Sequence, residues 1–261
     1  MKGAFFQQSL EYRLVVDGES WRQGGVIAGN LQVKNHGAKP AELTNLCVAL
    51  ADGKEKKVKA KPLDLKAAFE ILDRAGFSAV TVAPGGTSAP LEWKFQLMGD
   101  CRVTEKNHSL YVIYGTSDFA PSAGMLQTRV VPRQHFEDFI ESLVIANRFK
   151  LKGYASGKKG GVEFTLDPPD GREFSTIEEL VVTLKMEAGS TGEDLSASFL
   201  FYTKEVNPQA AGFALQKGKK LVERRFTPPQ YLSEFSKRVD KEQVEKALLE
   251  VLANFREGRL I

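Results

Sequence analysis

Apolar and polar residues alternate along much of the first half of the chain. In LEWKFQL, residues 91–97, every second side chain is apolar and those between are polar or charged. A period of two places one set of side chains on the inner face of a strand and the other set in solvent. Similar short segments occur at residues 14–16, 31–33, 46–50, 80–82, 109–116 and 125–132, with turn-forming pairs such as Asp17-Gly18 and Asp52-Gly53 between them. Strands at this spacing predict an antiparallel β-sandwich and argue against alternating strands and helices.

Three glycines lie at the entrance to the strand predicted around residues 31–33. Gly24, Gly25 and Gly29 belong to WRQGGVIAGNLQVKN, residues 21–35. Glycine permits a positive φ and a close approach of two backbones. We therefore expect a bend or bulge where the chain enters this strand.

A lysine-rich segment, GKEKKVKAKP at residues 53–62, follows the turn at Asp52-Gly53. It is short, Glu55 interrupts it, and no aromatic residue is interleaved for base stacking. We interpret it as a solvated loop or a lysine-protected edge strand. Asp64 then has the position of a helix cap, and Gly76 that of a helix end. The helix predicted between them carries Leu65, Ala68, Phe69 and Leu72 on one face.

After Pro132 the period of the apolar residues changes from two to that of a helix. This change marks our predicted domain boundary. Strands are expected again in NRFKLKGYA, GVEFTL, ELVVTLKM and DLSASFLFYTKE. The predicted organisation is a β-sandwich at 1–132, a second β-sandwich with a leading helix at 133–229, and a helical tail at 230–261. The apolar residues of the connecting helix are Phe136, Phe139, Ile140, Leu143 and Val144.

The tail carries start signals for an amphipathic helix. Asp240 and Gln243 have the spacing of a capping box, and Val239 and Val244 that of a hydrophobic staple. The apolar stripe of this helix must be buried, and we favour docking on its own domain over a dimer or partner interface. The stripe comprises Val244, Ala247, Leu248, Val251, Leu252 and Phe255.

Composition adds few constraints. The 261 residues suffice for one large domain or two of ordinary size. The formal charge of +3, from 36 basic and 33 acidic residues, does not indicate a nucleic-acid binder. Cys47 and Cys101 cannot form a disulfide framework and are expected to be reduced. Neither a secretory leader nor an apolar run long enough to span a bilayer is visible, so we expect a cytoplasmic protein without a transmembrane segment.

No catalytic, metal or cofactor pattern emerges from the sequence. His36, His108 and His135 lack metal-ligand spacing with other ligating residues. GYASGKKGG, residues 153–161, lacks the Ser or Thr of a phosphate-binding loop and is interpreted as a hairpin tip. APSAG, residues 120–124, only loosely matches a nucleophile elbow around Ser122. The neighbouring carboxylates Glu178-Glu179 and Glu193-Asp194 have no geometry that a sequence can define.

Several stretches resemble the bacterial sporulation-control proteins, whose two domains are arrestin-like β-sandwiches. QGGVIAGNLQV at residues 23–33 looks like an arrestin-type strand entrance that lacks the usual proline and glutamate. Residues 128–152 are similar to the strand–proline–helix passage between the domains of that family. Residues 161–186 resemble its second-domain hairpin. The segment Asp64–Gly76 and the strand near Tyr202 depart from the family pattern, which indicates a remote relative.

The resemblance implies a non-enzymatic cytoplasmic scaffold, adaptor or regulatory protein of a bacterial signalling or developmental pathway, without a cofactor. A sandwich edge can accept a partner segment as an added strand. The alternative is a hydrolase or transferase with an active site between two β-rich domains, where His108 or His135 would meet Ser122 or paired carboxylates. An unidentified protein partner is expected, with a homo-oligomer through the C-terminal helix as a further option and no nucleic acid. Our candidate contact residues are Lys56, Lys57, Lys59, Val244, Leu248, Val251, Leu252 and Phe255.

Overall fold

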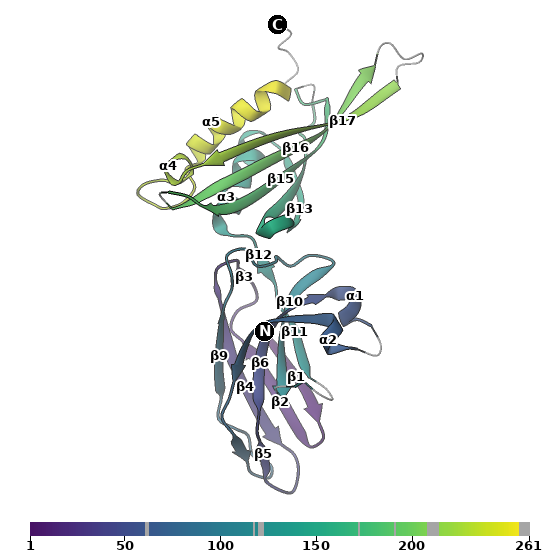
Figure 1. Cartoon of the computed structure of the whole chain (residues 1–261), viewed down its shortest axis with the longest axis vertical. Helices are drawn as coiled ribbons and strands as arrows, with labels where there is room; N and C mark the ends of the chain where they lie inside the picture. The colour runs from purple at the N-terminus through teal and green to yellow at the C-terminus, as the bar shows by residue number, and fades with distance from the viewer. Residues whose placement is uncertain are drawn as a thin grey trace. The chain divides into compact units, whose positions relative to one another are not determined.

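The chain forms two compact units in the computed structural model, which describes residues 1–60, 63–116, 118–119, 123–171, 173–190, 192–207 and 214–255. Unit 1 comprises Met1–Val131 and unit 2 comprises Pro132–Ile261 (Figure 1). The helical tail, which we predicted as a separate region, falls within unit 2.

Unit 1 contains two four-stranded antiparallel sheets. The first has the order β1 (Lys2–Gln7), β2 (Leu10–Val16), β4 (Val26–Asn35), β9 (Leu91–Gln96). The second has the order β11 (Gly124–Gln127), β10 (His108–Thr116), β6 (Leu46–Lys54), β7 (Phe69–Gly76). Two small pairs complete the unit: antiparallel β5 (Ala41–Leu43) with β8 (Val80–Val82), and parallel β3 (Trp21–Arg22) with β12 (Val130–Val131).

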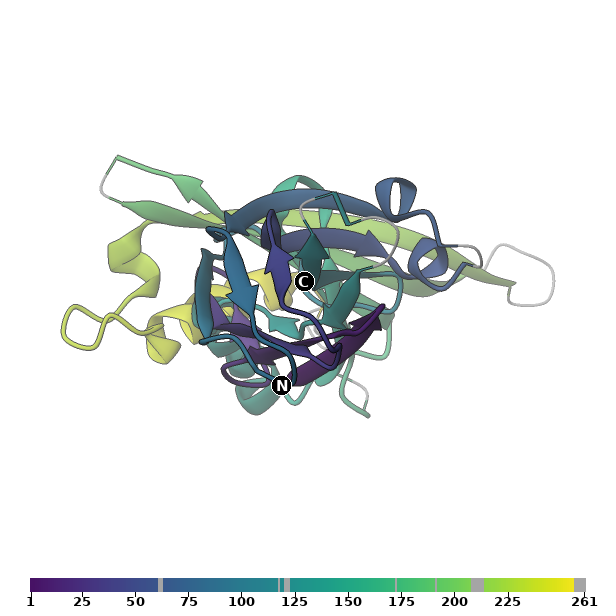
Figure 2. The same cartoon turned by 90° about the horizontal axis from the view of Figure 1, so that it is seen from below.

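The two sheets of unit 1 form separate layers around one apolar core (Figures 1 and 2). Leu14, Leu31 and Trp93 project into this core from the first sheet, and Leu50 and Val112 from the second. In β4 and β9 the period of two identified the inner face of the strand. Strand β10 is buried almost throughout, and Tyr111 and Ile113 on its other face belong to a second apolar cluster. The prediction of a mainly antiparallel β structure is confirmed.

Two of the three glycines at the entrance of β4 have a clear structural reason. Gly24 adopts φ +78°, a left-handed conformation that favours glycine. At Gly29, an added Cβ would lie 2.0 Å from the carbonyl oxygen of Val15 and 2.9 Å from the Trp93 ring. Gly24 therefore turns the chain, and Gly29 lets β2, β4 and β9 lie close together.

The helix predicted from Asp64 to Gly76 is wrong beyond its first turn. Asp64 Oδ1 does accept hydrogen bonds from the backbone N–H groups of Lys66 and Ala67, at 3.0 and 3.2 Å. The helix α2 (Leu65–Ala68) nevertheless ends after four residues, and the chain continues as β7. Pairing with β6 satisfies the backbone of β7, and Phe69 packs edge-on against Tyr111 with ring centroids 5.2 Å apart. Tertiary pairing here overrides the local helical pattern.

The lysine-rich segment also differs from our expectation of a loop or edge strand. Its first residues complete β6, and the next form the one-turn helix α1 (Glu55–Val58). Lys61 and Pro62 at its end lie outside the described residues.

Unit 2 is built on one five-stranded antiparallel sheet. Its order is β13 (Lys150–Ser156), β14 (Val162–Asp167), β15 (Ile177–Ala188), β16 (Glu193–Asn207), β17 (Ala214–Phe226). The remaining elements are α3 (Gln134–Ala146), α4 (Pro228–Tyr231), α5 (Lys241–Leu252) and the short 3₁₀ turns Lys158–Gly160 and Ala253–Phe255.

Helices α3 and α5 cover one face of this sheet (Figure 1). The ring of Phe139 on α3 lies 6.4 Å from that of Phe199 and 5.6 Å from that of Phe226, centroid to centroid. Phe255, directly after α5, stacks on Phe201 with centroids 3.8 Å apart. Among the described residues, the layer opposite the sheet is therefore helical. The amphipathic stripes of both helices form this layer.

Helix α5 begins as predicted. Asp240 Oδ1 accepts a hydrogen bond from the Gln243 backbone N–H at 3.2 Å, and Val239 and Val244 are both buried beside it. The Gln243 side chain bonds to the Asp240 carboxylate, at 3.2 Å, so this part differs from a strict capping box.

Candidate functional site

The lysines of α1 form an exposed basic surface in unit 1. Lys56, Lys57 and Lys59 are all exposed. Lys59 forms an ion pair with Glu55 one turn earlier. The Lys57 ammonium donates a hydrogen bond to the carbonyl oxygen of Ala67, at 3.1 Å, and so connects α1 to α2. These three residues, predicted as candidate contacts, lie together on a structured and accessible element.

A pocket of about 320 Å³ opens beside this surface. We call it the basic pocket. The strand register explains part of its lining, because Asp52 lies opposite Glu70 and Lys54 lies opposite His108. The complete lining is Asp52, Lys54, Lys57, Lys66, Ala67, Ala68, Phe69, Glu70, Arg102 and His108.

Asp52 is the most engaged carboxylate of the basic pocket. Its Oδ2 lies 2.7 Å from Arg102 Nε, and its Oδ1 lies 3.5 Å from His108 Nδ1. The side chains of Asp52 and His108 are only 16% and 20% exposed, whereas that of Arg102 is 45% exposed. Asp52 therefore anchors a cation and a histidine at the inner part of the pocket.

Strand β17 provides a second basic surface, in unit 2. It is the terminal strand of the sheet, and β16 is its only partner among the described strands. The exposed charged side chains of β17, here called the β17 edge, are Lys217, Lys219, Lys220, Glu223, Arg224 and Arg225. Leu221 lies among them and is 59% exposed.

Three basic side chains of the β17 edge contact side chains of neighbouring strands. Arg225 Nε lies 2.8 Å from Asp194 Oδ2, and Lys217 Nζ lies 3.3 Å from Glu178 Oε2. The Lys219 ammonium lies 4.9 Å from the centroid of the Tyr202 ring. The strand thus presents five basic side chains and one acidic one along an edge.

The sequence prediction did not include β17. Its polar composition hides the alternation on which strand prediction depends. Basic residues spaced along a strand are, however, typical of an edge strand, where they disfavour pairing with any strand that lacks complementary charge. The density of lysine and arginine between residues 217 and 225 was therefore an available signal.

The apolar stripe of α5 is not an exposed contact surface in this structure. Val244, Leu248, Val251, Leu252 and Phe255 were predicted as candidate contacts and are buried inside unit 2. Docking of the helix on its own unit, the alternative that we favoured, is the arrangement observed. These side chains pack the helical layer against the sheet.

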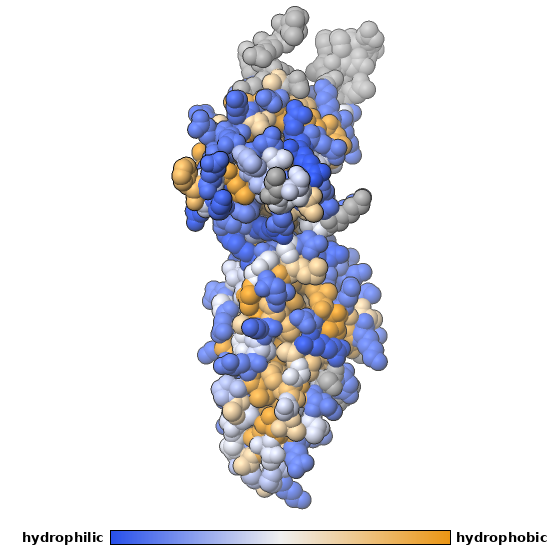
Figure 3. Space-filling model, turned by 60° about the vertical axis from the view of Figure 1, so that its left-hand side comes forward, coloured by the Kyte–Doolittle hydropathy of each residue, from blue (hydrophilic) through white to orange (hydrophobic). Residues whose placement is uncertain are grey.

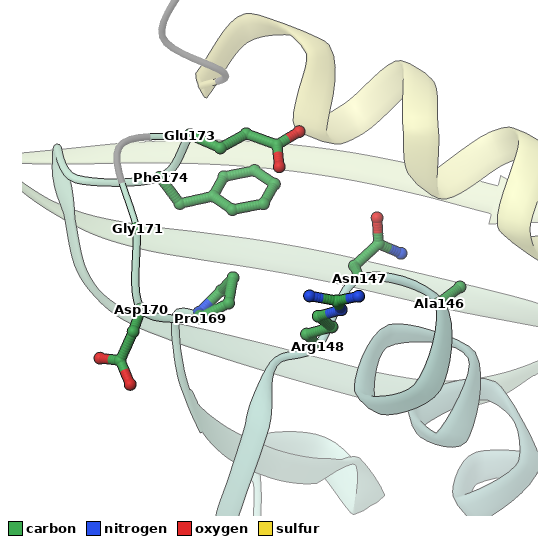
Figure 4. Close-up of a pocket in the computed structure, with 8 residues that line it drawn as sticks. All are labelled: Ala146, Asn147, Arg148, Pro169, Asp170, Gly171, Glu173 and Phe174. Atoms are coloured by element: carbon green, nitrogen blue, oxygen red, sulfur yellow. The ribbon is translucent and has the colours of Figure 1, made fainter.

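A smaller pocket, of about 170 Å³, lies at the end of α3 in unit 2. Figure 4 shows Asn147 and Arg148 on one side of it and Pro169 and Phe174 on the other, with the Asp170 carboxylate pointing away. Arg148 adopts φ +56° in the turn that follows the helix. Phe174 packs against Phe149, with ring centroids 5.4 Å apart. This pocket is the cleft of a helix-to-strand turn and has one cation opposite an aromatic wall.

The histidines considered for an enzyme have separate local partners. His36 Nε2 lies 2.8 Å from Glu11 Oε2, and His108 contacts Asp52 as described. His135, in unit 2, lies 3.3 Å from the carbonyl oxygen of Lys237. Ser122, the nucleophile considered with them, lies outside the described residues.

The neighbouring carboxylates of unit 2 pair with basic side chains. Glu179 contacts Lys152 at 3.3 Å, and Glu193 contacts Arg133 at 2.8 Å. Glu178 and Asp194 pair with the β17 edge as described. Each of these four carboxylates is thus held in an ion pair with a basic side chain.

The two cysteines are free. Burial raises the pKa of the Cys47 thiol, which disfavours the reactive thiolate. Within the described part of the chain, no three His, Cys, Asp or Glu side chains form a group that could hold a metal ion. No helix in that part is both long and apolar enough to cross a membrane.

Apolar side chains also reach the surface of unit 1. Phe6, Val26 and Met98 are exposed, and Figure 3 shows orange residues gathered on the face of this unit that it displays. Phe6 and Val26 lie near the ends of β1 and β4, and Met98 follows β9.

Comparison with known proteins gives a fold relationship. The crystal structure of Spo0M, a sporulation control protein from Bacillus subtilis, matches with a TM-score of 0.62 and 16% sequence identity. The match covers 95% of this chain and 100% of that chain. No protein-family model matches the sequence. A search of curated proteins also found no match.

Other solved structures match much less well. An alkylpurine DNA glycosylase from Pseudomonas fluorescens, bound to DNA with an abasic-site analogue, has a TM-score of 0.29 and 11% identity. The match covers 48% of this chain and 31% of the glycosylase chain. Red sea bream transglutaminase has a TM-score of 0.27 and 13% identity, over 85% of this chain and 27% of its own. These two similarities carry no argument about function. At the level of fold, the chain is a remote relative of the arrestin-like sporulation control protein, as the sequence resemblance predicted.

Proposed function

We propose that this protein is a non-enzymatic regulatory protein that acts as a scaffold or adaptor through protein–protein contacts. In this proposal, an extended acidic segment of a partner docks on the β17 edge. The name of the fold relative, a sporulation control protein, supports a regulatory role. The observation that carries the proposal is the long, accessible and basic edge of β17.

A strand edge of this kind binds through its backbone. In β-augmentation, main-chain hydrogen bonds to the edge supply affinity and the alternating side chains supply specificity. The 13 residues of β17 exceed the usual strand length of about five to six residues, so a partner strand of ordinary length would fit.

Charge complementarity identifies the partner segment. Lys219, Lys220 and Arg224 flank the exposed Leu221 and would face acidic side chains on an added strand. Opposite charges across neighbouring strands each contribute about 0.2–1 kcal/mol. An added strand that alternates acidic and apolar residues would place its acids beside Lys220 and Arg224 on one face and an apolar residue beside Leu221 on the other.

Affinity capture from cells of the source organism tests the proposal with two variants. The first carries Lys219→Glu, Lys220→Glu and Arg224→Glu, which reverse the edge charge and leave the ion pairs of Lys217 and Arg225 intact. The control carries Lys39→Glu, Lys94→Glu and Lys106→Glu, which make the same charge change at exposed positions of unit 1.

We expect the wild-type protein and the control to recover the same partners, and the β17 variant to lose them. Equal recovery by the β17 variant would remove β17 as the docking edge. Turnover of a small molecule by the purified protein, without any stable partner, would instead favour the alternative of a hydrolase or transferase.

A further inference from the structure

We infer that the basic pocket of unit 1 binds a phosphate monoester. This inference is independent of the β17 edge and assigns a ligand to the lysine-rich segment, which the proposed function leaves unused. The ligand class follows from the charge, the free hydrogen-bond donors and the size of the pocket.

The charge of the lining matches a dianion. Lys54, Lys57, Lys66 and Arg102 contribute four positive charges, and Asp52 and Glu70 contribute two negative charges, which leaves +2 from these six side chains. A phosphate monoester carries about −1.5 to −2 at neutral pH. A single carboxylate would leave a positive charge uncompensated.

The cations retain donors that the protein does not use. The structure shows no hydrogen bond or ion pair between the ammonium groups of Lys54 or Lys66 and any described residue. Lys57 Nζ gives one of its three N–H groups to Ala67, and Arg102 Nε gives one of five guanidinium N–H groups to Asp52. Charge-assisted hydrogen bonds from these groups to phosphate oxygens are among the strong polar contacts of proteins.

The lysines that line the pocket come from three separate elements. Lys54 ends β6, Lys57 belongs to α1 and Lys66 belongs to α2. The Asp64 cap fixes the first turn of α2, and the Lys57–Ala67 hydrogen bond connects α1 and α2. Convergence of three elements on one cavity makes this a site built by the fold, in contrast to lysines scattered along one helix face.

The size and the remaining lining limit the ligand. A volume of about 320 Å³ falls at the small end of pockets that bind small molecules, which span about 300–1,000 Å³. Ala67, Ala68 and Phe69 provide an apolar wall, and Glu70 offers an acceptor beside it. The ligand is therefore a small ester, with its phosphate at the lysines and its alcohol part against the alanines and Phe69.

Titration with phenyl phosphate, followed by NMR chemical shifts of the backbone amides, tests the inference. We expect saturable shifts confined to residues 52–58, 66–70, 102 and 108. A phosphoserine in a glycine peptide forms the second arm. If the natural ligand is a free ester, as we infer, phenyl phosphate binds and the phosphoserine peptide does not. If it is a phosphorylated segment of a protein, both compounds bind.

Three variants define the site. Lys54→Gln with Lys66→Gln is expected to weaken binding by about tenfold or more, because two charge-assisted contacts are lost. Lys39→Gln with Lys94→Gln, at exposed lysines outside the pocket, should bind as the wild type does. Glu70→Gln is expected to tighten binding, because it removes a negative charge that repels phosphate.

The inference is overturned if phenyl phosphate gives no saturable shifts, or if the Lys54→Gln, Lys66→Gln protein binds as tightly as the wild type. Circular dichroism verifies that the double variant is folded. If it is not, the single exposed change Lys66→Gln takes its place and must still weaken binding by more than the Lys39→Gln, Lys94→Gln control.

Discussion

At the residue scale, Gly29 determines how closely the strands of the first sheet approach. It lies opposite Val16 on one side and Trp93 on the other, in the middle of β4. The space of its missing side chain is taken by a backbone oxygen and an indole ring. The sequence revealed that this glycine is unusual, because it interrupts an alternating strand. Only the fold reveals which atoms fill the space.

Replacing Gly29 by alanine should destabilise unit 1. A Cβ 2.0 Å from the Val15 carbonyl oxygen forces the backbone apart, and overpacking of this kind costs about 1–3 kcal/mol. Both tryptophans, Trp21 and Trp93, belong to unit 1, so the fluorescence of a urea titration reports on this unit alone. The matched change Gly76→Ala, whose Cβ meets nothing within 4 Å, should alter the free energy of unfolding by less than about 0.5 kcal/mol. Equal effects of the two changes would contradict the close packing at Gly29.

Glu11 gives unit 1 a defined dependence on acid. Hydrogen bonds from the Arg13 guanidinium, at 2.7 and 2.8 Å, and then from His36 lower the pKa of the Glu11 carboxyl from 4.5 to about 2. A lowered folded-state pKa stabilises the protein above the ordinary pKa, and this contribution is lost as the pH falls. As the pH is lowered from 4.5 to about 2, we expect the urea concentration at the unfolding midpoint, followed by tryptophan fluorescence, to decrease.

The variant Glu11→Gln isolates this contribution, because it keeps the size of the side chain and removes the titrating group. Its urea midpoint should depend less steeply on pH over the same interval. An identical slope in the variant would assign the acid sensitivity to other carboxylates.

At the scale of elements, the sequence predicted the strands and helices in which apolar residues occupy one whole face. The strands β9 and β14–β16 and the helices α3 and α5 follow the predicted segments, because one full face of each is apolar. The pattern was misleading in β7, where Leu72 lies on the predicted inner face of a helix and is 47% exposed on a strand. It was uninformative in β17, where the side chains are mostly basic. Pairing with a neighbouring strand determines both elements, and such pairing leaves no local pattern.

Helix α5 should contribute strongly to the stability of unit 2. Leu248 is fully buried in its stripe, and truncation of such a leucine to alanine costs about 2–5 kcal/mol. Leu249, the next residue, is 45% exposed, so Leu249→Ala should cost less than about 1 kcal/mol. Urea unfolding followed by far-ultraviolet circular dichroism checks both. If both variants lose the same small amount of free energy of unfolding, α5 does not pack on its own unit in solution. Its apolar stripe would then be a candidate contact surface.

At the scale of the whole molecule, the chain combines a β-sandwich unit with a second unit in which helices cover one sheet. The sequence resemblance anticipated the shared fold, which the match to the sporulation control protein confirms. The site was less predictable. The lysines of α1 were named as candidate contacts from the sequence, but the pocket beside them also needs Arg102 and His108, which lie some 50 residues away. The register of β10 with β6 places His108 opposite Lys54, and an ion pair with Asp52 holds Arg102.

Hydrogen exchange of the β17 backbone, measured with and without a captured partner, tests the central claim most directly. In an edge strand, alternate N–H groups point away from the sheet and exchange with solvent until another strand accepts their hydrogen bonds. Our account predicts that saturating partner slows the exchange of alternate amides between residues 217 and 225. Unchanged exchange along β17, with protection appearing on another element, would contradict docking by strand addition at this edge.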